Sequence, residues 1–295
     1  QFCNLSEVVV REGDSIYDLE RKVRLATMLG TYQSTLTHFP YLRKVWQKNT
    51  EAERLLGVSL TGILDNKLLG DIVEQTKTLL ERLKDVSVDA NLQLSTALDI
   101  PASTAITCVK PSGTVSQLVD SASGIHPRHS KYYIRRVRGD KKDPLTTFMV
   151  QQGIPGEDCV MRPESTTVFS FPKKAPHNAL LREDLTAVQH LDLWMMYQQH
   201  WCEHKPSVTI SVTEDEWVEV GAWVWKNFDD ISGVSFLPYD GGTYKQAPYE
   251  ECSEEEYLEL LHKMPDTIDW DSLVEEDDNV EGAQQLACTA GVCEI

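Results

Sequence analysis

The chain of 295 residues carries 46 acidic against 28 basic residues, for a formal net charge of −18, and 41% of its residues are hydrophobic. It is long enough for one large domain or two medium ones. The acidic balance argues against a nucleic-acid-binding surface, and no run of 18 apolar residues could span a membrane. Seven cysteines without a signal-peptide pattern indicate free thiols and a cytoplasmic location.

Strand and helix signals alternate along the chain, which predicts an α/β architecture. The last 31 residues contain nine Asp or Glu and no Lys or Arg, and their apolar periodicity fades, so we expect one domain over 1–264 and a mobile acidic tail over 265–295. The expected elements, in chain order, are a strand at 2–10, a helix from a cap at Asp14 or Ser15 to about Gln33, a strand at 55–62, helices at 67–84 and 87–98, strands at 105–109, 134–137 and 166–171, a helix at 186–201, a strand at 207–212, and helices opened by capping boxes at Thr213 and Ser253.

The segment 110–118 follows an apolar run at 105–109 and precedes renewed helical spacing, an order typical of a strand, a tight loop and a helix start. Backbone N–H groups and hydroxyls at such a place form an anion site suited to phosphate. An ordinary capped helix is an equally good interpretation, and no P-loop motif is present. The residues that would bind phosphate are Ser112, Gly113, Thr114, Val115 and Ser116.

Two cysteines, Cys288 and Cys293, lie five positions apart near the end of the acidic tail. No further Cys or His in the tail completes a zinc site, which favours a redox dithiol. The 24 residues that separate Met264 from Cys288 give a flexible chain a span of about 25–30 Å, enough to reach a neighbouring active site. Nearby carboxylates raise the pKa of such thiols, so we expect them to dock in a less negative place.

The remaining sites are ambiguous from the residues alone. Cys3 lies in the first expected strand, where a cysteine is usually a small buried hydrophobe, and the same interpretation applies to the four cysteines between it and the tail. Seven Lys or Arg lie within 128–142, and this basic band either faces solvent or receives an anion such as the tail. The first residue is Gln1, and we expect the chain to be a piece of a longer or split polypeptide.

Four motifs and the terminal dithiol, in this order, resemble the catalytic chain of ribonucleotide reductases. The resemblance extends over essentially the whole chain and is greatest to the monomeric, adenosylcobalamin-dependent (class II) ribonucleoside-triphosphate reductases. Tyr239, Tyr244 and Tyr249 do not form the adjacent Tyr-Tyr pair that class I would require, and the tail has no Arg-x-x-Gly-Tyr, which class III would require. The motifs are Phe2-Cys3-Asn4-Leu5-Ser6-Glu7-Val8, residues 110–117, Ser121-Ala122-Ser123-Gly124-Ile125-His126-Pro127-Arg128 and Ser235-Phe236-Leu237-Pro238-Tyr239-Asp240-Gly241-Gly242.

The resemblance implies an α/β fold that is half of a ten-stranded barrel, the C-terminal half, followed by a flexible tail. It implies that Cys3 is one of two substrate-reducing cysteines, that the loop 112–116 binds the substrate phosphates, and that Cys288 and Cys293 re-reduce the active-site disulfide and pass it to a thioredoxin-type partner. The implied cofactor is adenosylcobalamin, which starts a thiyl-radical reaction on a ribonucleoside triphosphate. No cobalamin contacts can be named.

The segment Asn-Pro-Cys-Gly-Glu that carries the radical cysteine in such enzymes is absent from this chain. The resemblance therefore implies that an N-terminal half of the reductase is a required partner and that this piece alone is inactive. The alternative is a non-catalytic phosphate-binding or dithiol-relay module.

Overall fold

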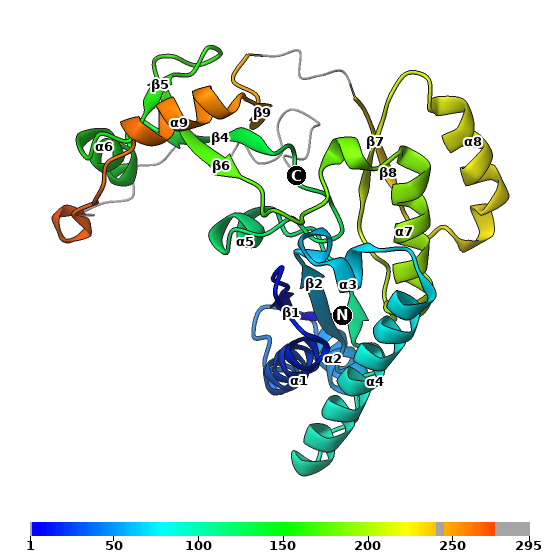
Figure 1. The fold of residues 1–295 in the computed structure, drawn as a ribbon. Helices are drawn as coiled ribbons and strands as arrows, with labels where there is room; N and C mark the ends of the chain where they lie inside the picture. Colours follow the sequence, from blue (N-terminus) through cyan, green and yellow to red (C-terminus); the bar gives the residue numbers. More distant parts are fainter. Residues whose placement is uncertain (1, 240–244, 275–295) are drawn as a thin grey trace. The chain divides into compact units, whose positions relative to one another are not determined.

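The computed structural model describes residues 2–239 and 245–274, which fold into two compact units (Figure 1). The first unit comprises the described residues of Gln1–Arg128 and Pro176–Tyr239. The second comprises those of His129–Ala175 and Asp240–Ile295. The domain boundary expected at residue 264 stays a prediction.

The first unit alternates strands and helices, as the sequence predicts. Its elements are β1 (Asn4–Val9), α1 (Ile16–Gln33), α2 (Lys44–Glu53), β2 (Leu56–Thr61), a 3-10 turn (Ile63–Asp65), α3 (Lys67–Gly70), α4 (Glu74–Ala97), β3 (Thr107–Cys108), α5 (Gly113–Leu118), a 3-10 turn (Arg182–Asp184), α7 (Ala187–His200), β7 (Thr209–Val212), α8 (Trp217–Lys226), a 3-10 turn (Phe228–Asp230) and β8 (Ser235–Pro238).

The strands of the first unit are all parallel. β1, β2 and β3 form one sheet in that order, and β7 pairs with β8 in another. A parallel bridge between Val109 and Pro206 joins the end of β3 to the segment that leads into β7. Parallel neighbours need crossover connections, and helices supply most of them here, since α1 and α2 lie between β1 and β2 and α3 and α4 between β2 and β3. The described residues do not close a barrel.

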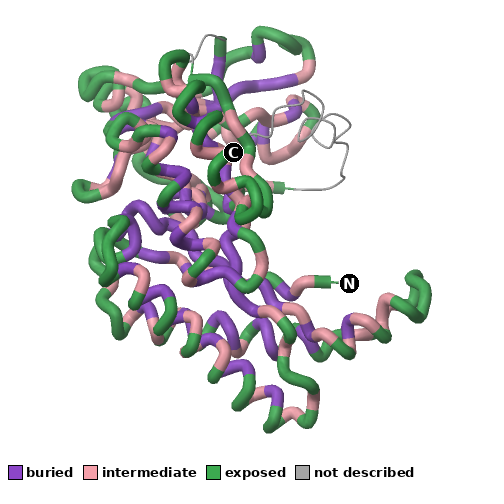
Figure 2. The backbone as a smooth tube through the Cα atoms, turned by 90° about the vertical axis from the view of Figure 1, so that its right-hand side faces the viewer, coloured by how far each residue is buried: buried purple, intermediate pink, exposed green. Residues whose placement is uncertain are grey.

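The core of the first unit lies between these sheets and their helices. Its largest side chains are Trp194, Tyr197 and Trp201, all from α7 or its C-terminal end and all fully buried. Each finds a partner for its polar atom: Trp194 donates to the carbonyl of Pro206, Tyr197 to that of Leu69 and Trp201 to that of Cys108. Figure 2 shows the alternation of buried and exposed positions along the helices that such amphipathic packing requires.

The second unit is built on an antiparallel sheet in the order β5-β6-β4-β9, with α9 packed against β6 and β4. Trp270 packs on Phe148 with ring centroids 5.4 Å apart, and the N–H of Asp269 donates to Gln152, so residues just beyond Pro265 contact this unit. Its elements are β4 (Tyr132–Asp140), α6 (Pro144–Gln151), β5 (Gly156–Asp158), β6 (Thr166–Lys174), β9 (Tyr249–Glu251), α9 (Glu254–Lys263) and a 3-10 turn (Trp270–Ser272).

Two helix predictions are wrong in detail. The expected helices at 67–84 and 87–98 are the short α3 followed by one continuous α4, and the break falls at residues 71–73. Ser87 explains the continuity, because its hydroxyl shares a 2.7 Å hydrogen bond with Thr27 of α1 in the core. The helix expected to start after Thr213 begins at Trp217, because the residues between form a turn in which Thr213 donates to Glu216.

Candidate functional site

The candidate site is one face of the parallel sheet β1-β2-β3. Successive residues of a strand point to opposite faces, and the face that carries Val8, Leu56 and Leu60 belongs to the core. The opposite face carries Glu7, Ser59, Thr61 and Cys108 beside Leu5 and Val9, and we call it the polar face. Glu7 of β1 and Cys108 of β3 lie on either side of Ser59 of β2 in one row across the sheet.

Cys3 precedes β1 and reaches the same face at Gly57 of β2. A Cβ atom at Gly57 would lie 2.8 Å from the sulfur of Cys3 and 3.5 Å from that of Cys108. Cys3 is partly exposed, whereas Cys108 is fully buried. Burial raises the pKa of the Cys3 thiol against the opposing effect of the Lys110 charge, and burial raises the pKa of Cys108 to about 12.

The two thiols are neighbours but not disulfide partners. β1 and β3 flank β2, and strands spaced by about 4.8 Å place Cα atoms on the outer two about 9–10 Å apart. A disulfide needs Cα atoms within about 7 Å. The arrangement therefore leaves Cys3 free to pair with a cysteine outside the described residues, and Cys108 stays a buried thiol.

The loop 110–116 leaves the sheet at the carboxyl end of β3. Ligands of parallel α/β sheets bind at this end of the strands. The N–H of Lys110 donates to the hydroxyl of Ser59 over 2.9 Å, which anchors the start of the loop to β2. α5 begins at Gly113, and the first N–H groups of a helix have no acceptor within it.

The three hydroxyls of the loop differ in environment. Ser112 is buried, and its hydroxyl lies close enough to the Glu7 carboxyl to lower the pKa of that group, but it makes no hydrogen bond of good geometry. Burial has the larger effect and raises the pKa of Glu7. Ser116 donates to the carbonyl of Gly113, while Thr114 is exposed. The backbone N–H groups and Thr114 are thus the parts of the loop best placed for an external anion.

The motif 121–128 adjoins this loop, since the N–H of Ser121 donates to the carbonyl of Ser116. The motif also contributes Arg128 to a buried ion pair. Arg128 donates to both carboxylate oxygens of Asp65, over 2.9 and 2.8 Å, and each side chain is only 4% exposed. The same carboxylate accepts from the N–H of Ala122. Gly62, which directly precedes the 3-10 turn Ile63–Asp65, has φ +78°, and a Cβ there would lie 2.6 Å from the carbonyl oxygen of Val10.

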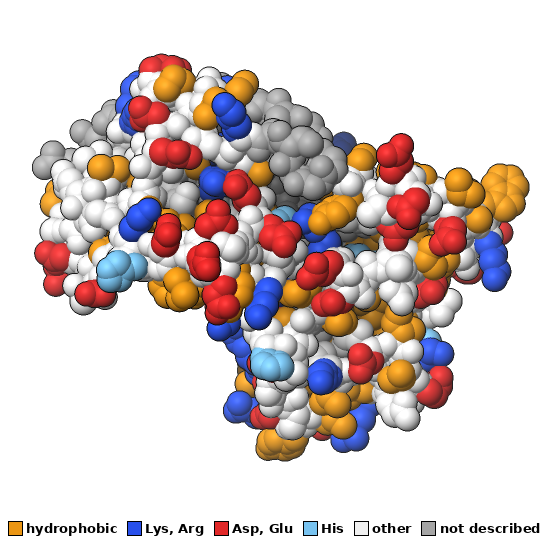
Figure 3. Space-filling view, turned by 45° about the horizontal axis from the view of Figure 1, so that its top comes forward, with side chains coloured by type: hydrophobic (Ala, Val, Ile, Leu, Met, Phe, Trp, Pro, Cys, Tyr) orange, Lys and Arg blue, Asp and Glu red, His pale blue; other side chains and the backbone are white. Residues whose placement is uncertain are grey.

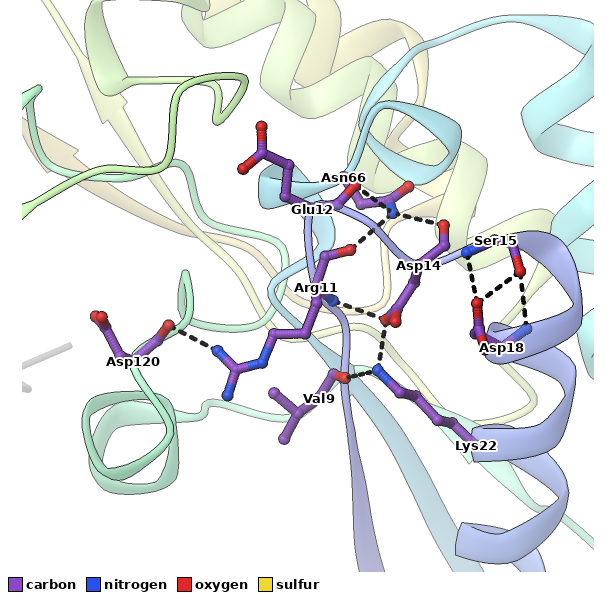
Figure 4. A network of polar contacts seen from close by, with 9 residues as sticks. All are labelled: Val9, Arg11, Glu12, Asp14, Ser15, Asp18, Lys22, Asn66 and Asp120. Atoms are coloured by element: carbon purple, nitrogen blue, oxygen red, sulfur yellow. Dashed lines mark hydrogen bonds and ion pairs between the residues drawn. The ribbon is translucent and has the colours of Figure 1, made fainter.

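A second network braces the loop that follows β1 (Figure 4). Asp14 accepts from the N–H of Arg11 and from Lys22, which also donates to the carbonyl of Val9. Arg11 extends to the carbonyl of Asp120, beyond the end of α5. Asn66 adds hydrogen bonds to the carbonyls of residues 11, 12 and 14. The three loops at the carboxyl end of the sheet are therefore held together by direct contacts.

The structure brings the predicted site residues together only in part. Cys3, just before β1, and the loop Ser112, Gly113, Thr114, Val115 and Ser116, after β3, lie in the first unit and flank two strands of one sheet. Cys288 and Cys293 lie outside the described residues, so their roles stay predictions.

The cysteines between these sites were all expected to be buried. The structure confirms this for Cys108, Cys159 and Cys202, but Cys252 is partly exposed.

The basic band at 128–142 is not one surface. Arg128 belongs to the first unit and is buried, while the rest lies in the second unit. There Arg135 lies over the ring of Tyr249, and Arg136 pairs with Glu250. On the face drawn in Figure 3, Lys and Arg side chains are interspersed with Asp and Glu. Because these side chains already have partners, the contacts favour the interpretation of the band as a solvated surface over that of an anion site.

Three residues of the site were not predicted: Glu7, Gly57 and Ser59. The alternation of β1 holds the signal for Glu7, since residues 3, 5 and 7 share one face. A glycine inside a strand signals the close approach of other groups, which is the signal for Gly57. Ser59 offers no signal in the sequence, because its role depends on the path of the chain after β3.

Comparison with known proteins gives no match to a family model. The chain is 30% identical over 301 residues to the adenosylcobalamin-dependent ribonucleoside-triphosphate reductase of Euglena gracilis, covering 99% of this chain and 40% of that protein. It is 28% identical over 328 residues to the protein of the same name from Lactobacillus gasseri, covering 99% and 43%. The chain thus spans about two fifths of the length of these relatives.

A crystal structure of a B12-dependent (class II) ribonucleotide reductase shares the fold. It superimposes with a TM-score of 0.76 at 24% sequence identity over 90% of this chain and 41% of that one. The mixed α/β architecture therefore matches part of that reductase. No helix of the described residues is long and apolar enough to cross a bilayer. The sequence relatives and the fold agree that the chain is homologous to the adenosylcobalamin-dependent, class II ribonucleotide reductases over about 40% of their length.

Proposed function

We propose that this chain supplies the substrate-phosphate loop and the reducing cysteines of an enzyme that reduces ribonucleoside triphosphates to 2′-deoxyribonucleotides. The observation that carries the proposal is the sheet β1-β2-β3, because the sulfur of Cys3 lies against Gly57 of β2, and the loop 112–116 follows β3 and is anchored to Ser59 of β2 through Lys110. Homology to the reductases over 99% of the chain supports the same assignment. The chain spans two fifths of such proteins, so the rest of the reductase must complete the site.

The strand arrangement supports half of a ten-stranded barrel as the fold. β1, β2 and β3 form one parallel sheet and β7 and β8 form another, and the parallel bridge from Val109 to Pro206 joins the two. One half of a ten-stranded barrel holds five strands of this kind. Their polar face carries the reactive groups, while the opposite face is covered by helices. In the proposed barrel, Cys3 and the loop therefore face the interior.

Cys3 would act as one of a pair of reducing thiols. Reduction removes the 2′-hydroxyl of the ribose as water and places hydrogen at C2′. Two thiols supply the two electrons and two protons and become one disulfide, which balances the step. The raised pKa of Cys3 keeps it protonated near neutral pH, which suits a donor of hydrogen. Since Cys108 is out of disulfide reach, the partner thiol lies outside the described residues.

The phosphate loop would hold the substrate by its triphosphate. Its free N–H groups and the exposed Thr114 point to an anion at the start of α5. Hydrogen bonds to charged phosphate oxygens contribute about 1.5–3 kcal/mol each, so three or four of them suffice to fix the ribose relative to Cys3. The hydrogen bond from the N–H of Lys110 to the hydroxyl of Ser59 holds the start of this loop against β2.

Adenosylcobalamin is the proposed radical source because the relatives depend on it by name. We assign the cofactor to the remainder of the reductase and route no step of this chain's chemistry through it.

Two protein partners follow from the proposal. The N-terminal half of the reductase would supply the second reducing cysteine and the radical cysteine. Cys288 and Cys293 would reduce the disulfide formed at Cys3, and a thioredoxin-type protein would then reduce that pair. Exchange of this kind runs through mixed disulfides and depends on thiol access, which suits a pair placed at the end of the chain.

The test is reconstitution of turnover. The purified chain is mixed with a separately produced N-terminal half of the Euglena relative, adenosylcobalamin, a ribonucleoside triphosphate and dithiothreitol, and deoxynucleotide is measured. We expect product only when both halves are present, and none with Cys3→Ser. The matched control is Cys159→Ser, in the second unit, which should retain turnover.

Absence of product from two folded halves that bind each other would contradict the proposal. In that case a phosphate-binding or dithiol-relay module would remain as the function of the chain.

A further inference from the structure

Gly57 stands out on the polar face because it is the one strand position in the sheet β1-β2-β3, among the described residues, that has no side chain. Its neighbours on the flanking strands fill the vacant space. A Cβ at Gly57 would lie 2.5 Å from Cδ2 of Leu5 and 2.8 Å from the sulfur of Cys3. Both distances are shorter than carbon atoms tolerate, so a side chain here must displace one or both groups.

We propose that Gly57 is a positioning residue for the Cys3 thiol, whose sulfur occupies the space that a side chain on β2 would take. The inference builds on the proposed role of Cys3 in reduction. Glycine inside a strand costs about 0.5–1 kcal/mol relative to alanine, so its use here needs a compensating role. The close approach of two strand-borne groups supplies that role.

The position of the thiol has a chemical consequence. In the space beside Gly57 the Cys3 sulfur is half-buried, and Cys108 closes the far side of the space. A methyl group at position 57 would push the sulfur toward solvent, because the buried Cys108 and β2 itself block the other directions. The thiol would then lose the burial that raises its pKa and would react faster at neutral pH.

The test measures the reactivity of Cys3 in the full 295-residue chain. Gly57→Ala is compared with the parent and with Gly221→Ala, whose Cβ would meet nothing within 4 Å. The proteins are treated with iodoacetamide between pH 7 and 10, and alkylation of the N-terminal peptide is followed by mass spectrometry. We expect the pH midpoint for Cys3 to fall in Gly57→Ala, with about a tenfold faster rate at neutral pH per unit of that fall.

Gly221→Ala should leave the Cys3 profile at that of the parent. A Gly57→Ala profile that coincides with the parent's, or moves to higher pH, overturns the inference. Far-UV circular dichroism verifies the fold, and the clashing atoms are side-chain ends, so the backbone can stay in place. If the single variant does not fold, the double variant Leu5→Ala/Gly57→Ala removes the closer clash and leaves only the sulfur to move.

The readout needs no turnover, so it separates this inference from the proposed function. Unchanged alkylation together with active reconstitution would reject only the role of Gly57. Altered alkylation together with two bound but inactive halves would reject the proposed function and keep the positioning of Cys3.

Discussion

Replacing Asp65 by alanine tests whether the buried ion pair holds the loops at the carboxyl end of the sheet. Asp65 accepts two hydrogen bonds from Arg128 and one from the N–H of Ala122, at 2.8–2.9 Å. Removing the Asp65 carboxylate would leave the Arg128 guanidinium, which is 4% exposed, without this ion-pair partner. Arg128 also contacts the carboxylate of Asp120 at 3.3 Å, whose side chain is 61% exposed and so compensates the buried charge only in part.

The expected cost follows from that geometry. Breaking a buried pair by removing one partner costs about 3–5 kcal/mol, because the other charge stays buried without compensation. At a urea m-value of about 2 kcal/mol per molar, this lowers the unfolding midpoint by about 1.5–2.5 M. The control is Glu74→Ala, which removes the exposed pair with Lys77 and should cost below about 0.5 kcal/mol.

The assay is urea unfolding at pH 7.5, followed by tryptophan fluorescence, which reports on the buried Trp194 and Trp201. Adding Arg128→Met to Asp65→Ala should restore part of the lost stability, because the buried guanidinium charge of Arg128 is removed as well. A midpoint for Asp65→Ala no lower than that of Glu74→Ala would refute the reasoning. So would a double variant that is less stable than the single one.

Three further predictions concern single residues. Burial lowers the pKa of His190 to about 3; the folded state therefore binds fewer protons, and stability is lost as pH falls below 6.5, by about 2 kcal/mol at pH 5. Urea unfolding at pH 8 and 5 should show this loss shrinking in His190→Gln, and an equal loss in both proteins would contradict it. Gly62→Ala combines φ +78° with a Cβ 2.6 Å from the carbonyl of Val10, so thermal unfolding should show destabilisation of about 1–3 kcal/mol, and an unchanged midpoint would count against the strain. In the native chain, iodoacetamide should label Cys3 well before Cys108, because burial raises the pKa of Cys108 to about 12; equal labelling rates would show that the sheet face is open.

The elements with local signals were predicted well. Ser15, one of the two expected caps, caps its helix, and Ser253 caps another as its capping box indicates. The strand before the loop 110–116 lies where its apolar run predicts. The break between α3 and α4 was placed wrongly, because Ser87 and its neighbouring valines are poor helix formers whose place in α4 depends on packing against α1. The short β8 and β9 pair with strands farther away along the chain and carry little signal of their own.

The site was predictable to the extent that it follows the chain locally. Cys3 and the loop 112–116 are identifiable from motifs, whereas the row formed by Glu7, Ser59 and Cys108 depends on the register of three strands separated by long crossovers. The ion pair between Asp65 and Arg128 joins residues 63 positions apart, and neither has a local pattern. Periodicity gives the faces of an element but not the neighbour that meets each face.

The most direct test of the account is the redox state of Cys3 after turnover without added reductant. The reduced Cys288→Ser/Cys293→Ser variant, in which the tail thiols cannot re-reduce Cys3, is mixed with the N-terminal half, adenosylcobalamin and a ribonucleoside triphosphate. The reaction is quenched by alkylation, and disulfide-linked peptides are identified by mass spectrometry alongside the deoxynucleotide formed. The account predicts that oxidation of Cys3 rises in proportion to product and needs the nucleotide, while Cys108 stays reduced. Product formed while Cys3 remains a free thiol would contradict it.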